Sequence, residues 1–577
     1  MNQTNPEAAR EAADFDAVRT AGVPLAQRLA ALAQRSAAHS DHAIWIERLS
    51  VDASLAFVPA GAQGPLAGLT FALKDNIDLA GVPTTAGCPA YARVPERSAT
   101  VVERLLAAGA TPLGKTNLDQ FATGLVGTRS PHGACRNALF PDRISGGSSS
   151  GSAVAVALGE VDFALGTDTA GSGRVPAALN GLVGLKASRG LLPTTGVVPA
   201  CRSLDCVTTF TRCVADAAEL LELLAGPDGE DPGARELTAR WFPGPPRIAV
   251  PDVAALAFPD PAYGPAEFER ARARLEALGY EIVPVDPAPF IAAGDLLYSG
   301  PWIAERTAAV GAFLSEHPDA VHPVTAAIIG GGEKIDAVST FRGFDALRAR
   351  AMEAAAVFAN ADAVLMPTVD RFPTLAEVEA EPIAVNTALG RFTNFMNLLD
   401  YAAVAFPAGT SSAGLPFGVT LFAPAGTDRA LLEIAAAFEG RPLRATRGFT
   451  LAVAGAHMSG LPLNGQLRER GGRLIRAART APGYRLLALP GGPPQRPALI
   501  PDPNGTAQID IELWDLPAER IGDLLAGVPA PLAFGRLKIE DGSEVVGFVG
   551  GAGAEAGARD VTEHGSWRAW LAAQEGG

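Results

Sequence analysis

Lysine and histidine are scarce in this chain of 577 residues. Only five lysines and seven histidines are present, so arginine supplies nearly all of the 47 basic residues. Acidic residues number 62, which gives a net charge of −15. Because contacts with phosphates need a basic face, this balance argues against nucleic acid as a partner. Any chemistry that depends on lysine or histidine has few residues to choose from.

Cysteines are few, and long apolar runs are missing. The five cysteines are an odd number and unevenly spaced, which is typical of reduced thiols rather than of a disulfide framework. No stretch approaches the roughly 18 apolar residues that a membrane-spanning helix needs. Residues 1–16 are polar and acidic and lack the pattern of a secretory signal. These absences predict a soluble, cytoplasmic protein with no membrane partner.

The composition and the alternation of elements favour an α/β fold. Hydrophobic residues make up 48% of the chain and charged residues 19%, enough for a large buried core. Up to Gly440, short apolar strands alternate with helical stretches, which predicts one domain around a large sheet. Thr100 and Glu103 have the spacing of a capping box. We expect strands at 69–73, 110–113, 246–251, 281–285 and 363–366, helical structure around Leu25, Leu29 and Leu32, and helices at 101–108, 265–278 and 429–438.

The character of the sequence changes after Gly440. Residues 441–450 are basic and polar and predict a linker. Beyond them, strand-like runs at 485–489 and 544–548 flank a loop rich in proline and glycine at 490–503, and Glu540 and Asp541 suit a hairpin tip. The predicted division is a catalytic domain at 1–440 with a helical N-terminal segment at 1–60, a linker at 441–450, and a smaller β-rich α+β domain at 451–577.

Residues 145–152 read Ser-Gly-Gly-Ser-Ser-Ser-Gly-Ser and precede an apolar Ala/Val run. A flexible linker is one interpretation. A glycine-rich turn before a buried helix instead aims backbone N–H groups at one point, which suits an anion or a developing oxyanion. The segment also matches the G-x-S-x-G nucleophile elbow, although the polar residues 137–144 make a poor preceding strand. The Gly-Lys-Ser/Thr ending of a phosphate-binding loop is absent.

A second glycine–serine turn covers residues 166–176. Ser172 lies 24 residues after Ser148 and is preceded by three small residues, Thr169, Ala170 and Gly171. Their backbone N–H groups predict an oxyanion hole, because bulky side chains there would block a substrate carbonyl.

These two turns, with Lys74 at the end of a predicted strand and the segment 114–121, resemble the amidase signature family. The resemblance covers about residues 20 to 440. It implies an amidase signature fold, in which helices flank a large mixed central sheet. It also implies that Ser172 is the nucleophile, that Ser148 is a bridging serine, usually with a cis peptide bond, and that Lys74 is the base.

The chemistry of this triad is coherent without the resemblance. A serine hydroxyl is too weak an acid to attack an amide unaided, so a base must lie within reach. No histidine lies near either serine turn, and lysine serves once burial and neutral hydroxyl partners lower its pKa. Lys74 would take the proton of Ser172 through Ser148 and return it to the leaving amine. The alternative is a solvated Lys74 paired with Asp75.

Three other charged residues near these turns have simpler interpretations. Lys115 is the competing lysine, and by the resemblance it is structural. Asp168 and Arg174 flank the second turn and predict an ion pair that fixes it, unless each faces solvent.

The segments 296–306, 393–400 and 453–464 resemble the allophanate hydrolases among these amidases. This implies a substrate, allophanate (urea-1-carboxylate), that is converted to ammonia and carbon dioxide through an acyl-serine, in urea or triazine nitrogen catabolism. It also implies that the C-terminal domain is similar in fold to gamma-glutamyl cyclotransferases. An amidase of other specificity is the first alternative. A non-catalytic scaffold subunit is the second, although the intact triad argues against it.

Allophanate is a small planar anion, so its site needs a fixed cation. Arg306 is the candidate, because a guanidinium grips a carboxylate with two parallel hydrogen bonds. Tyr298 lies eight residues earlier, about two helical turns, and can share a helix face with Arg306. Gly124 matches a position where the family's backbone contacts substrate. The alternatives are a core tyrosine, an Arg306 that pairs with Glu305 or an aspartate, and a plain turn glycine.

The C-terminal domain offers one candidate residue. His457 lies between small residues and suits an anionic first product, in line with the proposal that this domain speeds its decarboxylation in the family. The alternative is a structural histidine in a domain that joins subunits of a homo-oligomer. The sequence has no HExxH, paired CxxC or dinucleotide fingerprint. We therefore expect no metal and no cofactor, and a small molecule as the partner.

Overall fold

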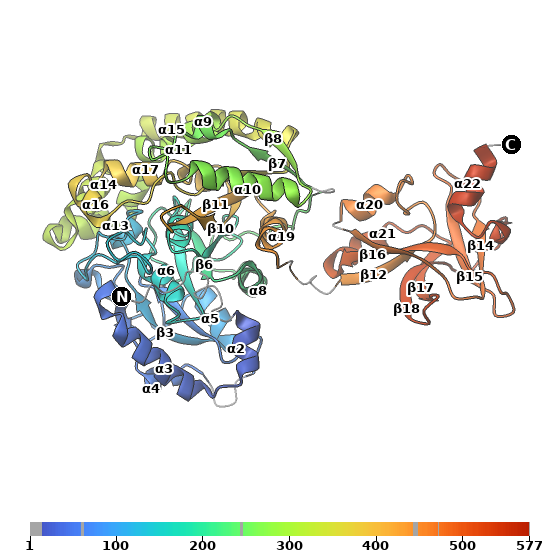
Figure 1. Cartoon of the computed structure of the whole chain (residues 1–577), viewed down its shortest axis with the longest axis horizontal. Coiled ribbons are helices and arrows are strands. Elements are labelled where there is room, and N and C mark those ends of the chain that lie inside the picture. Colours follow the sequence, from blue (N-terminus) through green and yellow to red (C-terminus); the bar gives the residue numbers. More distant parts are fainter. Residues whose placement is uncertain are drawn as a thin grey trace. The chain divides into compact units, whose positions relative to one another are not determined.

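The computed structural model describes residues 14–58, 63–242, 246–441, 443, 448–470 and 472–575. The chain divides into two compact units, one of residues 1–240 and 246–443 and the other of residues 241–245 and 444–577. The boundary after residue 443 falls inside the predicted linker, and Figure 1 shows the elements of each unit. No helix in the described ranges is long and apolar enough to cross a membrane.

A mixed sheet of 11 strands forms the centre of the first unit, in the order β1-β3-β2-β4-β6-β5-β10-β11-β9-β7-β8. The strand bounds are β1 Trp45–Arg48, β2 Thr70–Lys74, β3 Thr111–Thr116, β4 Phe163–Asp168, β5 Val183–Lys186, β6 Cys206–Thr211, β7 Arg247–Val250, β8 Glu281–Pro284, β9 Ala363–Pro367, β10 Tyr401–Thr410 and β11 Pro416–Pro424. Strand β2 runs parallel to both β3 and β4, so the C-terminal ends of β2 and β4 lie next to each other on the same side of the sheet. In the centre of the sheet, each neighbouring pair in the order β4-β6-β5-β10-β11 is antiparallel. The predicted mixed sheet is confirmed.

Helices pack against this sheet and extend beyond it. Their bounds are α2 Phe15–Ala21, α3 Leu25–Ala38, α4 Val51–Leu55, α5 Thr100–Ala107, α6 Ser150–Ala157, α7 Arg174–Leu179, α8 Val214–Leu224, α9 Val253–Leu256, α10 Pro265–Ala277, α11 Ala288–Gly294, α12 Leu296–Ser299, α13 Trp302–Glu316, α14 Pro323–Gly330, α15 Ala337–Ala355, α16 Leu375–Ala380, α17 Ala384–Leu389, α18 Asn394–Leu398 and α19 Asp428–Glu439. The strands and helices expected with bounds before Gly440 are present within a few residues, and α3 covers the helical spacing around Leu25, Leu29 and Leu32. Part of the predicted helical segment 1–60, residues 1–13 and 59–60, lies outside the described residues.

The predicted capping box at the start of α5 is wrong. The N-cap is Ala99, which offers no side-chain cap, and Thr100 is already the first helical residue. Its hydroxyl donates instead to the carboxylate of Asp228, at 2.7 Å. A partner distant in sequence replaces the local contact that the spacing indicated.

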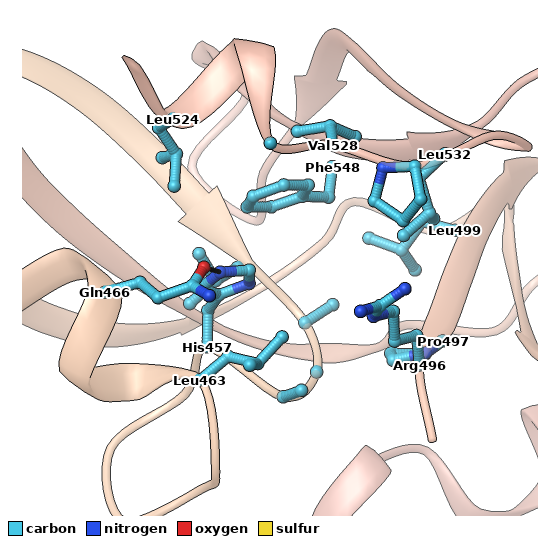
Figure 2. Close-up of a pocket in the computed structure, with 16 residues that line it drawn as sticks. His457, Leu463, Gln466, Arg496, Pro497, Leu499, Leu524, Val528, Leu532 and Phe548 are labelled. Carbon is cyan, nitrogen blue, oxygen red and sulfur yellow. Dashed lines mark hydrogen bonds between the residues drawn. The ribbon is translucent and has the colours of Figure 1, made fainter. Parts of the chain in front are cut away.

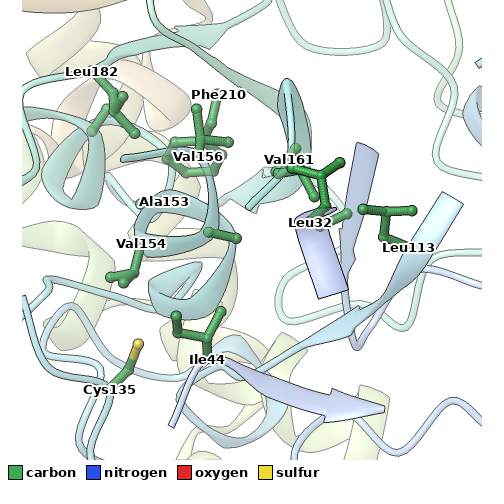
Figure 3. Packing of buried hydrophobic residues seen from close by; sticks show 14 of the residues in the cluster. Leu32, Ile44, Leu113, Cys135, Ala153, Val154, Val156, Val161, Leu182 and Phe210 are labelled. Atoms are coloured by element: carbon green, nitrogen blue, oxygen red, sulfur yellow. The ribbon is translucent and has the colours of Figure 1, made fainter. Parts of the chain in front are cut away.

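The glycine–serine segment packs tightly, so the flexible-linker interpretation is wrong. Helix α6 begins at Ser150, and its residues 150–156 are buried. A Cβ atom at Gly151 would overlap the backbone carbonyl oxygen of Ile44, so a larger residue does not fit. Figure 3 shows Val154 and Val156 of this helix in the apolar cluster that also holds Leu32. The small residues therefore allow a close approach between α6 and its neighbours.

The second unit is β-rich, as expected. A five-stranded sheet has the order β13-β16-β12-β18-β17 and a three-stranded sheet the order β15-β14-β19. The bounds are β12 Gly448–Val453, α20 Asn464–Arg468, β13 Arg473–Arg479, β14 Tyr484–Ala488, β15 Pro497–Pro501, β16 Asp510–Pro517, α21 Ile521–Ala526, β17 Leu532–Lys538, β18 Glu544–Gly550, β19 Arg559–Asp560 and α22 Trp567–Glu575. Strand β15 lies within the predicted loop 490–503, which is therefore only partly a loop.

The hairpin of β17 and β18 carries Glu540 and Asp541 at its tip, as predicted. Both carboxylates pair with Arg476 of β13, at 3.0 Å each. The similarity of this unit to gamma-glutamyl cyclotransferases stays a prediction.

Candidate active site

Lys74 ends strand β2 and has no exposed surface. Its Nζ donates hydrogen bonds to the hydroxyls of Ser148, at 2.7 Å, and Thr167, at 2.8 Å. Burial lowers the pKa of Lys74 to about 7, although nearby carboxylates, Asp119 foremost, oppose this effect. A substantial share of this amine is therefore neutral near pH 7 and free to accept a proton.

The alternative pairing of Lys74 with Asp75 does not occur. Asp75 instead forms a buried ion pair with Lys115, at 3.1 Å, and neither side chain is exposed. The two buried lysines thus differ in their partners. Lys115 has a carboxylate, whereas Lys74 has two neutral hydroxyls.

The turn before α6 holds Ser148 close to Lys74. The Gly147–Ser148 peptide bond is cis. The amide of Asp119 donates to the Ser148 carbonyl at 3.2 Å, and its carboxylate accepts from the amides of Val126, Gly127 and Arg129. A Cβ at Gly147 would overlap this carboxylate, so glycine is required there.

The nucleophile-elbow hypothesis for this turn is wrong. The central Ser149 hydroxyl donates to the Thr167 carbonyl at 3.1 Å and accepts from the Thr167 amide at 3.3 Å. No strand forms in residues 137–144, all of which the structure describes. Ser149 is therefore bound to the backbone of β4 and is not presented to a substrate.

The second turn carries Ser172, which is 2% exposed. The amide of Ser149 donates to the carbonyl of Ser172 at 3.4 Å, so the two serine turns lie side by side. The predicted Asp168–Arg174 ion pair forms, at 2.9 Å, with both side chains fully buried. Burial alone would raise the pKa of Asp168, but Arg174 and the amide of Gly171 hold it below its usual value.

The Asp168 carboxylate also reduces the number of amide donors in the predicted oxyanion hole from three to two. The Gly171 amide donates to Oδ1 of Asp168 at 2.8 Å and is therefore already used. The proposed donors that remain are the amides of Thr169 and Ala170. The Thr169 hydroxyl donates to Asp205, at 2.5 Å, and the Ala170 carbonyl accepts from the Thr393 hydroxyl, at 2.7 Å. These contacts hold Thr169 and Ala170 in place through a hydroxyl and a carbonyl, and neither contact uses their backbone amides.

Arg306 of α13 is 2% exposed, yet it forms no ion pair with any described carboxylate. Its Nη1 donates to the Thr123 hydroxyl at 3.3 Å, and its Nε has no partner within the described ranges. The neighbouring Glu305 turns away and accepts from Cys201 and Ser203. The alternative in which Arg306 pairs with Glu305 or an aspartate is therefore wrong, because no described carboxylate forms an ion pair with this buried cation.

Tyr298 contacts Arg306, but the two residues do not share the face of one helix as predicted. Helix α12 ends at Ser299 and α13 begins at Trp302, so no continuous helix joins the two residues. The guanidinium carbon nevertheless lies 5.9 Å from the centroid of the tyrosine ring, within cation–π range. Gly124 follows Thr123 in the chain, and a Cβ there would lie 2.6 Å from a carboxylate oxygen of Asp119. The structure thus brings Arg306, Tyr298 and the segment 123–124 together.

Comparison with known proteins decides the family. Residues 38–432 match the family model described as Amidase. The chain belongs to the amidase family. Residues 449–572 match a second model, described as the allophanate hydrolase C-terminal domain.

Solved and curated relatives agree with this assignment. A solved structure of Kluyveromyces lactis allophanate hydrolase is 36% identical, with a TM-score of 0.79 over 98% of this amidase and 100% of that chain. A glutamyl-tRNA(Gln) amidotransferase subunit of Halobacterium salinarum is 35% identical, covering 66% of this amidase and 97% of that protein. The resemblance to the allophanate hydrolases is confirmed.

Urea amidolyase of Saccharomyces cerevisiae is 40% identical over 88% of this amidase. The match covers 30% of that protein, and the same holds for the Lachancea kluyveri urea amidolyase, so the amidase spans under a third of the length of these relatives.

Three polar residues of this amidase's site were not singled out from the sequence. Thr167 accepts from Lys74, Thr123 accepts from Arg306, and Asp205 accepts from Thr169. Thr167 is the penultimate residue of β4, and Asp205 immediately precedes β6, the strand that pairs antiparallel with β4. Only a prediction of this strand pairing would have brought the two residues together from the sequence. Within the described ranges, no group of His, Cys, Asp and Glu is placed to hold a metal ion.

The second unit of the amidase contains a cavity of about 60 Å³ beside His457. The ring stacks on Phe548, with centroids 4.8 Å apart, and its Nε2 lies 3.0 Å from Oε1 of Gln466. Figure 2 shows Arg496 across the cavity from this ring. Burial, with help from the positive charge of Arg496, lowers the pKa of His457 and favours the neutral ring. The cavity therefore combines one cation with one neutral proton acceptor.

Proposed function

We propose that this chain hydrolyses allophanate, an amide that carries a carboxylate one atom away from the attacked carbonyl. The observation that carries the proposal is the Arg306 guanidinium, which is buried, donates to the Thr123 hydroxyl and has no ion pair with a carboxylate among the described residues. Such a cation is stabilised when an anionic substrate supplies the missing charge. The similarity to Kluyveromyces lactis allophanate hydrolase over 98% of the chain supports the same substrate.

In the proposed reaction, neutral Lys74 accepts a proton from Ser148 as Ser148 accepts one from Ser172. The Ser172 oxygen attacks the terminal amide carbonyl, and the amides of Thr169 and Ala170 stabilise the oxyanion. Lys74 returns the proton through Ser148 to the leaving nitrogen, and ammonia departs. Water then cleaves the ester by the same route and releases N-carboxycarbamate, which loses carbon dioxide.

Arg306 and Tyr298 hold the substrate carboxylate in this proposal, and the backbone at Gly124 borders the amide. A carboxylate bound by a guanidinium gains two charge-assisted hydrogen bonds, which fix orientation as well as position. The contact between Arg306 and the tyrosine ring keeps the planar cation in one orientation. The site therefore favours an anionic amide over a neutral one.

We also propose that the cavity beside His457 binds the anionic first product. Arg496 supplies the positive charge, and the neutral ring accepts the proton of the product's carboxylic acid and returns it to the product nitrogen as the carbon–nitrogen bond breaks and carbon dioxide leaves. His457→Ala is expected to leave release of the first ammonia unchanged and to delay release of carbon dioxide and of the second ammonia, which is freed only after decarboxylation. A carbon dioxide trace identical to that of the wild type would favour the other role for this unit, which is to join subunits of a homo-oligomer.

The direct test of the function is ammonia release from allophanate and from a panel of neutral amides. Wild-type protein is expected to prefer allophanate strongly, and Ser172→Ala is expected to release none. Activity that survives in Ser172→Ala would overturn the mechanism. Equal rates on neutral amides would replace allophanate with a broader amidase specificity. Supply of the substrate by carboxylation of urea or by cleavage of biuret, and a cytoplasmic location, stay predictions.

A further inference from the structure

Residues 200–205, here called the bridging loop, lie between two parts of the candidate site. One part is helix α13, which carries Arg306, and the other is the turn 169–172, which carries Ser172. The amides of Leu204 and Asp205 both donate to the Cys201 carbonyl at 2.9 Å. The bridging loop therefore folds back on itself as a compact turn.

The bridging loop is attached to α13 through Glu305. One carboxylate oxygen of Glu305 accepts from the Ser203 amide at 2.7 Å. The other accepts from the Ser203 hydroxyl at 2.6 Å and from the Cys201 thiol at 2.8 Å. Because Glu305 immediately precedes Arg306, these bonds hold the backbone of α13 at Arg306 against the loop, while Thr123 and the Tyr298 ring contact the guanidinium itself.

The bridging loop is attached to the oxyanion turn through Asp205. This buried carboxylate accepts from the Thr169 hydroxyl at 2.5 Å, and it also accepts from the amides of Ala200, at 2.9 Å, and Cys201, at 3.1 Å. Burial raises the pKa of Asp205 to about 6, which leaves it ionised at neutral pH. One charge-assisted hydrogen bond, from the Thr169 hydroxyl to Asp205, thus joins the loop to the residue that begins the oxyanion turn, and the amides of Ala200 and Cys201 hold this carboxylate in place.

A second attachment on the same side comes from Asn397 of α18. Its side-chain amide donates to the carbonyls of Asp168, at 2.7 Å, and Leu204, at 3.0 Å. The end of β4 and the bridging loop are therefore joined at two points, and α13 is joined to the same loop at Glu305. These contacts form one continuous path from Arg306 to Thr169.

We propose that Asp205 and Glu305, acting through the bridging loop, set the distance between the Arg306 guanidinium and the oxyanion turn and so select the length of the substrate. This rests on the proposed function, because it takes Arg306 as the carboxylate anchor. The selected length is one atom between the attacked carbonyl and the carboxylate. Neither residue touches the substrate, so both are positioning residues. One added carbon displaces the carbonyl by about 1.5 Å, and misplacement by about 1 Å costs on the order of 100-fold in rate.

The test compares three amide carboxylates as competitive inhibitors of allophanate hydrolysis. Oxamate, malonamate and succinamate place zero, one and two carbons between the two groups, and malonamate has the spacing of allophanate. Wild-type protein is expected to bind malonamate at least about tenfold more tightly than the other two. Asp205→Asn and Glu305→Gln are expected to bring this preference close to one. Succinamate should bind these variants as well as malonamate does.

Asp231→Asn is the matched control. Asp231 also accepts from a threonine hydroxyl and its amide, those of Thr194, at 2.8 and 2.7 Å, but it contacts neither α13 nor the oxyanion turn. This variant is expected to keep the wild-type preference. The thermal midpoint of every variant is measured alongside, and if Asp205→Asn does not fold, Glu305→Gln decides.

The outcomes separate this inference from the proposed function. Loss of the preference in folded variants supports the inference. Variants that retain the preference while activity falls show that the loop is merely structural, which overturns it. A wild-type protein that hydrolyses allophanate but binds the three inhibitors equally overturns it while the proposed function stands. A wild-type protein that does not hydrolyse allophanate removes the proposed function, and the inference falls with it.

Discussion

The Nζ atom of Lys74 lies 2.7 Å from the hydroxyl oxygen of Ser148, and neither side chain is exposed. A buried amine whose partners are neutral hydroxyls loses its hydration without gaining a counter-charge in contact. Its proton is therefore held loosely, which is the property that a general base at neutral pH requires.

The activity is expected to depend on pH through Lys74. The neutral amine is the active form, and the pKa of Lys74 is lowered to about 7, so kcat/KM on allophanate should rise with pH and level off above about 8. Asp205, whose pKa is raised to about 6, becomes protonated and loses its charge as the pH falls, so kcat/KM should decrease more steeply below pH 6. Initial rates between pH 6.5 and 9.5 check the upper part of the curve. A rise that continues to pH 10 would show an ordinary lysine.

Lys74→Met and Lys115→Met are expected to fail in different ways. Loss of a general base lowers kcat by about 10²- to 10⁴-fold, so Lys74→Met should be nearly inactive yet folded. Lys115→Met leaves the buried Asp75 carboxylate unpaired, which costs about 3–5 kcal/mol of stability. Urea unfolding and ammonia release, measured on both variants, check this contrast. Equal loss of stability in the two would contradict the separate roles.

Substitution of Arg306 is expected to raise KM for allophanate. Charge-assisted hydrogen bonds contribute about 1.5–3 kcal/mol, so Arg306→Met should weaken binding by roughly 10- to 100-fold. Arg306→Lys keeps the charge but loses the planar fork and should fall between Arg306→Met and wild type. Labelling of Ser172 by a neutral serine-reactive carbamate serves as the control. Unchanged allophanate kinetics would refute the role of Arg306.

The Asp168–Arg174 ion pair is expected to support both stability and the oxyanion turn. Arg174→Met leaves a fully buried carboxylate unpaired, which costs about 3–5 kcal/mol. The exposed pair of Arg348 and Asp345 offers a matched control, since Arg348→Met should leave the urea midpoint unchanged. If both variants unfold at the wild-type urea concentration, the buried pair does not hold the turn.

Local pattern was sufficient to predict five of the 11 strands of the large sheet, β2, β3, β7, β8 and β9, together with the two serine turns. The apolar run before Lys74 forms β2, as predicted, whereas β4, which ends at Asp168, was not among the predicted strands. The small residues of α6 indicated close packing once their apolar context was considered. Each of these signals lies within a few neighbouring residues, where sequence and structure are tightly linked.

The contacts that complete the site depend on distant residues. Thr167 lies 93 residues from Lys74, and Thr123 lies 183 residues from Arg306, so no local spacing indicates either pair. The helix expected from Tyr298 to Arg306 is interrupted at Gly300–Pro301, and packing restores the contact that the interrupted helix does not provide. The bond from the Gly171 amide to Asp168 is local, only three residues apart. It depends on the conformation of the turn, which the sequence pattern does not specify.

The most direct measurement of the central claim is the identification of the covalent intermediate. Wild-type protein, mixed with allophanate and quenched in acid, is digested and analysed by mass spectrometry. The account predicts a carbamoyl ester on the peptide that carries Ser172, formed after the trapped adduct loses carbon dioxide, and no adduct in Ser172→Ala. An ester on Ser148 or Ser149, or turnover by Ser172→Ala, would contradict the account.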